Sequence, residues 1–406
     1  MWSRPGAGAR RTLGGVGTLT ADRAAADIRA AAREGLDLVA FWDAVTPAVA
    51  RAVPGCLSPC WFTVDPASLL ITSHVNPEMA DALPPEALAL EYYEDDAHSV
   101  ASVCRSGGVS TLHEACGGDV SRSPRWHANI ELGGDQELLA ALRTRGGDAW
   151  GTLGLYRERG APVFGHEERA FLEAVAPALA EGARTALLLG EAREPDSPGA
   201  PGLLVLSDRW EVESVTAGAE EVLDDLPGGD REAGRLPPSV LAVAGQARRS
   251  AEGRDAPGEV ALARVLGRGG RWLVLHGATL SGGGDRRVAV IVEHAHPARI
   301  APLLMRAHGL TAREQDVTRL VLQGASTAEI ARDLCVTPHT VQQHLKSVFE
   351  KTGVRSRREL VGRVFAAHYE PRLRDNEART RDGRPLRGGP VAVASPPGRA
   401  SRPDPP

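Results

Sequence analysis

The chain has 406 residues, of which 42% are hydrophobic and 24% charged; the composition is ordinary for globular proteins, and the length predicts about two to four domains. The formal net charge is −5, but residues 309–406 hold 17 Lys and Arg against 11 Asp and Glu, which places +6 in this end and −11 in residues 1–308. An acidic body thus bears a basic end, and the basic end is the candidate nucleic-acid binder.

The scarcity of lysine excludes several functions. Lys346 and Lys351 are the only lysines, so no Gly-Lys-Ser/Thr loop for nucleotide phosphates can lie upstream, and protein-kinase chemistry lacks its lysine. The hydrolase signatures H-E-x-x-H and G-x-S-x-G are absent as well, so we expect the protein not to be an enzyme. No run approaches the roughly 18 apolar residues of a membrane-spanning helix, which predicts no membrane partner.

The cysteines bear on location and on metal binding. Their odd number favours reduced thiols and a cytoplasmic protein. All of them except Cys335, together with His113, could form a thiolate metal or iron–sulfur site. However, the C-x3-C spacing of Cys56 and Cys60 is unusual for such a site, and scattered buried thiols are the favoured interpretation. The sequence therefore predicts no metal and no cofactor. The five cysteines are Cys56, Cys60, Cys104, Cys116 and Cys335.

The first half of the chain predicts a mixture of helices and strands. Periodicity and turn residues, among them Gly35 and the sequence Asp65-Pro66-Ala67-Ser68, set the expected boundaries. The predicted elements are a flexible arm (1–18), helices over 20–33 and 36–53, a hairpin with strands 60–64 and 69–72, helices and loops to about 146, a strand over 150–157 and an amphipathic helix over 166–189.

Residues 19–190 resemble a GAF domain in this order of elements, which ends with the strand WGTLGLYR and a helix rich in phenylalanine and alanine. The resemblance implies a sheet flanked by helices that encloses a small-molecule effector or serves in dimerisation. Trp42, Trp61, Trp126 and Trp150 are numerous enough to line such a pocket, although a place in the hydrophobic core is the commoner role for aromatic side chains.

The middle of the chain predicts a second α+β domain. Residues 191–201 form a Pro- and Gly-rich charged linker. Two strands, helices and three antiparallel strands over residues 202–296 resemble a PAS domain in their order, and a connecting helix is expected over 297–308. Residues 370–406, rich in Pro, Gly and Arg, are expected to be disordered. The predicted elements of the PAS-like region are strands 202–207 and 211–216, a helix over 217–226, arginine-rich helical sequence, and strands 259–266, 271–280 and 287–292.

Residues 309–369 predict four short helices. The pairs Thr311 and Glu314, Ser326 and Glu329, and Ser356 and Glu359 each match the capping box, in which a hydroxyl and a carboxylate satisfy free backbone N–H groups at a helix start. The remaining helix has Thr337 as candidate N-cap and Pro338 at its first position. Gly324 and Gly353 fall where a left-handed residue would end a helix.

The helix predicted over 338–352 has two faces. Val341, Leu345 and Val348 recur at helical spacing and predict an inward stripe, with His344 as a structural residue at its edge. The outward stripe contains two amides of the kind that bind an adenine edge in the major groove, and a short turn joins this helix to the preceding one. The outward residues are His339, Gln342, Gln343 and Lys346, and the pattern is a helix-turn-helix.

These residues resemble the DNA-binding domain of LuxR-type transcription factors. The resemblance implies base contacts by Gln342, Gln343 and Lys346, with His339 at the groove rim, and phosphate contacts by Thr327, Thr340 and Lys351. Two residues depart from the family pattern. Thr352 replaces the usual leucine, and Gln342 occupies a position where the family often has a lysine that contacts bases. The residues that match the pattern are Leu310, Thr311, Arg313, Glu314, Val317, Leu320, Gly324, Glu329, Ile330, Ala331, Leu334, Thr340, Val341, His344, Lys351, Val354, Arg358, Glu359 and Leu360.

The sequence therefore predicts a multidomain regulator, with GAF-like and PAS-like α+β sensory domains followed by an all-α, four-helix LuxR-type domain. Its expected partner is double-stranded DNA, bound by a homodimer with residues 357–367 as candidate dimer face; a small-molecule effector and RNA polymerase are further candidates. Control by a phosphoacceptor receiver is not expected, because nothing upstream resembles one. The alternative is a sensor or protein-interaction module that does not bind DNA.

Overall fold

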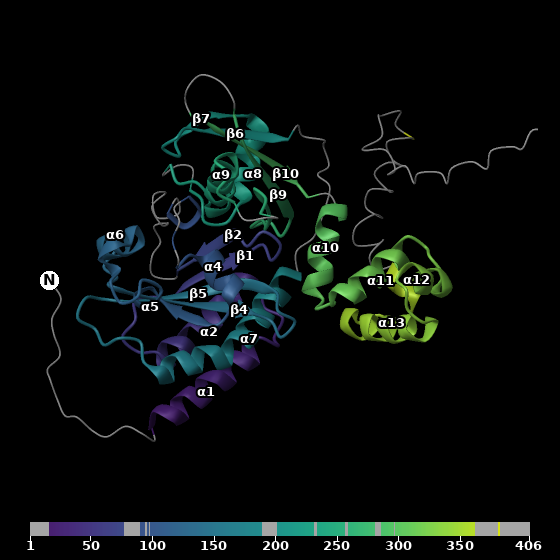
Figure 1. Cartoon of the computed structure of the whole chain (residues 1–406), viewed down its shortest axis with the longest axis horizontal. Helices are drawn as coiled ribbons and strands as arrows, with labels where there is room; N and C mark the ends of the chain where they lie inside the picture. Colours follow the sequence, from purple (N-terminus) through teal and green to yellow (C-terminus); the bar gives the residue numbers. More distant parts are fainter. Residues whose placement is uncertain are drawn as a thin grey trace, which may run out of the picture.

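The computed structural model describes residues 16–76, 90–93, 96, 98–188, 201–230, 234–255, 259–280, 286–295, 297–361 and 381. Two five-stranded antiparallel sheets with their helices form the body, and a group of helices at the C-terminal side lies apart from both sheets (Figure 1). Two α+β units followed by an all-α unit is the predicted fold class, which is confirmed. In the described ranges no helix has the length and apolar character needed to cross a membrane.

The first sheet has the strand order β2-β1-β5-β4-β3, with every pair antiparallel. Strands β1, β4 and β5 are buried along nearly their whole length, because both faces of the sheet are covered there. The elements of this unit are α1 (Val16–Ala31), α2 (Leu38–Ala52), β1 (Cys60–Val64), β2 (Ile71–Val75), α4 (Val100–Ser106), β3 (Val109–Thr111), α5 (Leu112–Ala115), a 3-10 turn (Val120–Arg122), α6 (Pro124–Glu131), β4 (Gln136–Arg143), β5 (Ala149–Arg157) and α7 (His166–Leu188).

Strand β4 shows how the two faces divide. Leu138, Ala140 and Leu142 belong to a core with α1, α2 and α7, whereas Leu139 and Ala141 belong to a second core on the opposite face. The alternation follows from the period of two in a strand. Three of the four tryptophans singled out from the sequence are fully buried (Trp42, Trp61 and Trp150), as expected for core residues; Trp126 is half-buried.

The structure corrects three boundaries in this unit. The interpretation of residues up to about 146 as helices and loops is wrong, because β3 and β4 lie there. Helix α1 begins at Val16, so the helix starts earlier than predicted and includes part of the expected arm; residues 1–15 lie outside the described part. Strand β2 begins at Ile71, because Leu69 has a positive φ of 61° and belongs to the turn.

The second sheet repeats the same order, β7-β6-β10-β9-β8. The predicted sequence of two strands, helices and three strands is confirmed. The predicted linker (191–201), apart from residue 201, and the turn at 281–285 lie outside the described residues. The elements of this unit are β6 (Gly202–Leu206), β7 (Val212–Val215), α8 (Ala217–Asp225), α9 (Pro238–Ala251), β8 (Leu262–Leu266), β9 (Trp272–Thr279) and β10 (Val288–His294).

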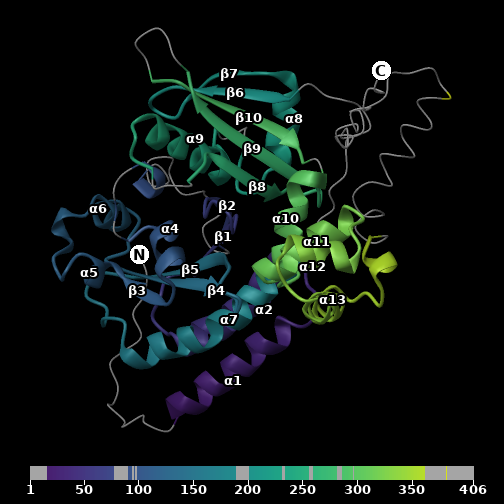
Figure 2. The same cartoon turned by 45° about the vertical axis from the view of Figure 1, so that its right-hand side comes forward.

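Helix α9 lies between the two sheets, and nearly all of its residues are buried (Figure 2). Val240, Val243 and Ala244 share one hydrophobic core with Phe62 of β1 and Leu275 of β9. The close packing is visible at Gly245, where a Cβ atom would lie 2.7 Å from Cβ of Tyr92. The two α+β units are therefore fused through α9.

Helix α10 (Pro297–Ala307) connects the body to the C-terminal helices. Ile300 and Leu303 lie in the hydrophobic core that contains residues of α7 and also Trp272 of β9, so one core joins α10 to both α+β units. Arg306 donates to the carbonyl oxygen of Pro66 at 3.1 Å, and Arg184 of α7 donates to the carbonyl oxygen of Ala307. The start of the C-terminal unit is thus fixed to the first sheet and its helices.

Candidate nucleic-acid interface

The C-terminal unit consists of α11 (Ala312–Leu322), α12 (Thr327–Asp333), α13 (Pro338–Thr352) and a helical segment that begins at residue 357. Val341, Leu345 and Val348 of α13 are buried, and His344 is half-buried beside them, as the periodicity predicts. The core of this unit contains Leu310, Val317, Val321, Ile330, Ala331, Val341, Leu345, Val348, Val354 and Leu360.

Local capping fixes where these helices begin. Both halves of the capping box form at Thr311 and Glu314 and at Ser326 and Glu329. The third pair forms in part: Ser356 Oγ accepts from Glu359 N at 3.1 Å, but the Glu359 carboxylate accepts from the backbone N–H of Arg355 at 2.8 Å.

The turn before α13 and the end of that helix also follow the predicted pattern. Thr337 caps α13 by accepting from Thr340 N, and Pro338 occupies the first turn. Gly353 ends α13 in the left-handed conformation, with φ 68°. The turn between α12 and α13 includes Cys335, whose φ of 53° is a backbone conformation that residues other than glycine rarely adopt.

Capping of α12 gives a testable prediction. Ser326→Ala is expected to destabilise α12 by about 1 kcal/mol, because the N–H of Glu329 loses its acceptor and the helix has only seven residues. Faster amide hydrogen exchange within α12, measured by mass spectrometry on the full chain, would show the loss. Ser214→Ala, at an exposed serine of β7, is the control and should leave exchange unchanged; equal exchange in α12 for both variants would contradict the capping role.

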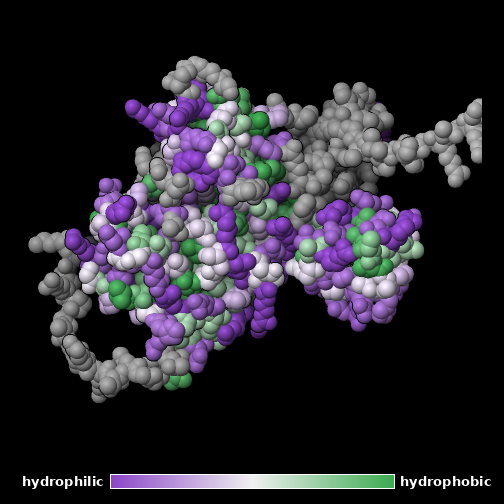
Figure 3. All heavy atoms as spheres, in the orientation of Figure 1, coloured by the Kyte–Doolittle hydropathy of each residue, from purple (hydrophilic) through white to green (hydrophobic). Residues whose placement is uncertain are grey.

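The outward face of α13 is polar and open. His339, Gln342, Gln343 and Lys346 are all exposed, so no described residue covers this face. Gln343 Nε2 donates to His339 Nε2 at 3.1 Å, which holds the amide along the helix axis. Figure 3 shows the lobe formed by α11–α13 with mostly hydrophilic side chains on the visible surface. The geometry fits insertion of α13 into a major groove.

Glu314 connects α11 to α13 beneath this face. The residue is only 5% exposed. Its carboxylate accepts a hydrogen bond from Thr311 N at 2.7 Å and, across the helix interface, from Ser347 Oγ and Lys351 Nζ, both at 2.6 Å. Burial alone would raise the pKa of the Glu314 carboxyl. These hydrogen bonds and the charge of Lys351 have the larger, opposite effect, so the pKa is lowered overall to about 2. The sequence predicts Glu314 as a member of a capping box, whereas this second role, a contact across the helix interface, has no local sequence signal.

The candidate phosphate contacts occupy different surroundings. Thr340 Oγ1 lies 2.8 Å from Thr337 Oγ1, and both threonines predicted to face phosphate, Thr327 and Thr340, are half-buried near helix starts. Lys351, by contrast, is bound to Glu314, which gives its ammonium a structural partner. A phosphate contact by Lys351 would have to share that ammonium with the Glu314 carboxylate.

The two departures from the family pattern are accommodated. Thr352 is buried, and its hydroxyl donates to the carbonyl oxygen of Val348 at 2.7 Å, so the polar side chain is satisfied without leaving the core. Gln342 is exposed and available to a ligand. The candidate dimer face at 357–367 is described only up to residue 361.

Charged residues buried in the first α+β unit were not singled out from the sequence. Arg125 of α6 binds both oxygens of Glu137 of β4, at 3.1 and 2.8 Å, and Glu91 at 2.6 Å. Glu137 also accepts from Tyr156 and Asn129, both at 3.1 Å. Burial raises the pKa of Glu137, but Arg125 and His98 lower it to about 2 overall.

The cysteines of this unit are free thiols. Cys60 contacts Asn76 and Cys104 contacts Thr152, and burial raises the pKa of these thiols to about 12 and about 11. In the ranges that the structure describes, no group of three or more His, Cys, Asp or Glu side chains is arranged to hold a metal ion.

Three helices with a capped, exposed third helix define a helix-turn-helix of the kind found in transcriptional regulators. Residues 308–364 match the model of the family described as bacterial regulatory proteins, luxR family. The spore germination protein GerE of Bacillus subtilis is 38% identical over 52 residues, which cover 13% of this chain and 70% of GerE. The chain belongs to the LuxR family of bacterial regulatory proteins.

The chain is also similar to a much longer regulator and to a solved sensor protein. An HTH-type transcriptional regulator of Mycobacterium bovis is 52% identical over 52 residues, which cover 13% of this chain and 6% of that protein. The chain therefore spans a small part of the length of this larger relative. A GAF sensor protein from Burkholderia vietnamiensis aligns over 42% of this chain and 98% of its own, with 15% identity and a TM-score of 0.29.

Proposed function

We propose that the protein is a cytoplasmic, sequence-specific transcriptional regulator that binds double-stranded DNA through α13 and is not an enzyme. The observation that carries the proposal is the exposed row His339, Gln342, Gln343 and Lys346, held above a packed core by two complete capping boxes and by the Glu314 contact. Amide side chains at such positions can bind adenine bidentately, and an ammonium can bind guanine.

The two α+β units are proposed to control DNA binding in response to a small molecule or a partner protein. Support comes from α10, which packs on α7, shares a hydrophobic core with Trp272 of β9 and leads directly into α11. A change in either unit would therefore reach the DNA-binding helices through a single packed helix. We further propose a homodimer, since two copies would match a palindromic operator; light scattering on the DNA complex tests this stoichiometry.

The base contacts give the central test. An operator is first selected by the purified full chain from genomic fragments and confirmed by gel shift. Gln343→Ala and Lys346→Ala are each expected to weaken operator binding by about 1–3 kcal/mol, roughly tenfold to a hundredfold, because each removes hydrogen bonds to base edges. Gln323→Ala is the matched control, since Gln323 is an exposed glutamine at the end of α11 and does not belong to α13.

Two results would overturn the proposal. Binding that shows no preferred sequence and disappears with added salt would mean phosphate attraction alone. Normal operator affinity for both α13 variants would show that other residues read the bases. If the chain fails to bind any DNA while it forms a complex with another protein through α13, the helix-turn-helix serves protein interaction instead.

A further inference from the structure

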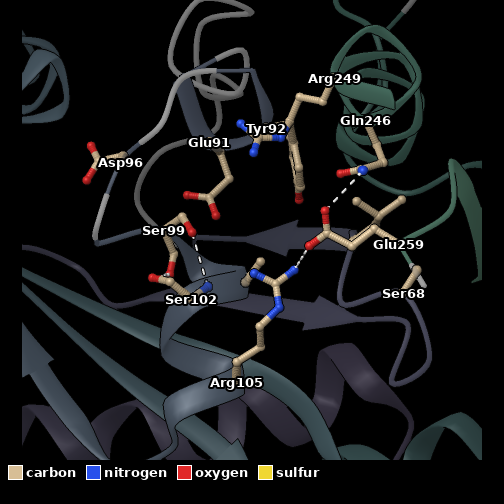
Figure 4. A pocket seen from close by; sticks show the side chains of 12 residues that line it. Ser68, Glu91, Tyr92, Asp96, Ser99, Ser102, Arg105, Gln246, Arg249 and Glu259 are labelled. Atoms are coloured by element: carbon tan, nitrogen blue, oxygen red, sulfur yellow. Dashed lines mark hydrogen bonds and ion pairs between the residues drawn. The ribbon is translucent and has the colours of Figure 1, made fainter. Parts of the chain in front are cut away.

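A small cavity of about 120 Å³ lies where the two α+β units meet (Figure 4). Helix α4 of the first unit forms one side, and α9 of the second unit forms the other. The volume is well above the roughly 10–15 Å³ that one water molecule needs and below the about 300–1,000 Å³ of sites for drug-sized ligands. A ligand of a few heavy atoms fits this space. Its polar lining includes Glu91, Ser102, Arg105, Gln246, Arg249 and Glu259.

One side of the cavity is already internally paired. Arg105 of α4 forms an ion pair with Glu259, and Gln246 Nε2 of α9 donates to the same carboxylate at 3.3 Å. Figure 4 shows these side chains meeting across the boundary between the units. They connect α4 to α9 and fix the width of the cavity.

Glu91 is different, because one of its oxygens has no partner. Its side chain is 4% exposed, and Oε2 accepts from Arg125 at 2.6 Å. Oε1 is buried and accepts no hydrogen bond from any described residue, although the backbone N–H of Val100 faces the carboxylate closely enough to lower its pKa. The net effect of burial is a raised pKa for Glu91. A buried carboxylate oxygen without a donor is costly, and a bound donor would remove that cost.

The polar groups of the lining indicate which donor fits. The lining holds three carboxylates, those of Glu91, Asp96 and Glu259, and two guanidinium groups, those of Arg105 and Arg249. Arg125 also binds Glu91, from outside the lining, so the charges around the cavity balance. The free acceptor Oε1 of Glu91, rather than net charge, therefore selects a ligand with a hydrogen-bond donor. A primary ammonium is compact and offers three N–H donors, which suits a narrow site with a free carboxylate oxygen.

We propose that this cavity binds a small molecule with a primary ammonium group, which donates to Glu91 Oε1. The inference rests on the proposed function, for which it supplies the chemical class of the effector. Because the ligand would touch both α4 and α9, it would tie the two α+β units together. Helix α9 packs against β9, and Trp272 on the other face of β9 lies in the same hydrophobic core as α10, so the bound state would be transmitted through that core to the element that carries the DNA-binding helices.

Calorimetric titration of the full chain, without DNA, tests the proposal with defined probes. Propylammonium chloride and L-alanine carry the ammonium, and they distinguish an amine from an amino acid. Tetramethylammonium chloride carries the charge without an N–H, and sodium propionate carries only a carboxylate. We expect saturable binding of at least one ammonium probe and none of the last two.

Two variants locate the site. Glu91→Gln should weaken binding of the ammonium probe by about tenfold or more, because the charged acceptor is lost. Ala101→Leu fills the cavity from α4 without changing any charge and should abolish binding, which keeps the test valid if Glu91→Gln disturbs Arg125. Glu131→Gln, at an exposed glutamate at the end of α6, is the matched control and should bind as the unmodified chain does.

Absence of binding by both ammonium probes would overturn the inference, and so would equal binding by tetramethylammonium or by the Ala101→Leu variant. Operator binding by the same samples, measured without probe, separates this result from the proposed function. Intact operator binding without probe binding rejects the cavity alone, whereas probe binding without operator binding rejects the DNA-binding role.

Discussion

Replacing Arg125 with alanine is expected to lower the free energy of unfolding of the first α+β unit by about 3–5 kcal/mol, because it leaves buried carboxylates without their cation. Glu137 and Glu91 are 1% and 7% exposed, and both bind the same guanidinium. Removing a buried charge partner costs more than the original pair contributes, since the remaining charges stay desolvated. Hydrogen exchange in β4 and the thermal unfolding midpoint of the full chain measure the loss.

The matched control is Arg235→Ala, which breaks a partly exposed ion pair with Asp230 at 2.6 Å. Solvent screens such a pair, so the expected cost is about 0–1 kcal/mol. Equal destabilisation by the two substitutions would mean that the buried network contributes no more than a surface pair. Partial recovery in an Arg125→Ala, Glu137→Gln double variant would confirm that the unpaired charge is the cause.

The C-terminal helices could be predicted from the sequence because their signals are local. A capping box requires residues three positions apart, and the glycines that end helices stand next to the positions they affect. The outward face of α13 follows from one period of 3.6 residues. Each of these signals can be recognised in the sequence without knowledge of the rest of the fold.

Strand β4 could not be predicted in this way. Its sequence, QELLAALR, consists of residues that favour helices in isolation. It becomes a central strand because β3 and β5 pair with it on both edges and hydrophobic cores cover both faces, so tertiary contacts outweigh local propensity.

The buried charges were missed for a related reason. Arg125 lies 34 residues from Glu91 and 12 from Glu137, and isolated charged residues in a sequence indicate a solvated surface. The fold alone brings them together. For the same reason the cavity beside Glu91 had no sequence signature, since α4 and α9 lie on different α+β units.

Glu314→Gln is expected to destabilise the packing of α11 on α13 by about 3 kcal/mol, near the lower end for removing one member of a largely buried charge pair. The expected loss of stability is not larger because the Lys351 ammonium is partly exposed, and solvent screens its attraction to Glu314. Glutamine retains an acceptor for Thr311 N but not the charge that binds Lys351. Faster hydrogen exchange in α13 of the full chain measures the effect, and operator affinity should fall with it because α13 loses its fixed orientation.

Glu329→Gln is the matched control, because Glu329 occupies the same capping position on α12 but is exposed and reaches no residue of α13. It should leave exchange in α13 unchanged. The Glu314 contribution also has a defined pH dependence: with a folded-state pKa of about 2 against an ordinary value of 4.5, it is fully present above pH 4.5 and is lost as the pH falls towards 2. The difference in α13 protection between the unmodified chain and Glu314→Gln should therefore shrink across that window, and a constant difference would show that the charge of Glu314 does not hold the two helices together.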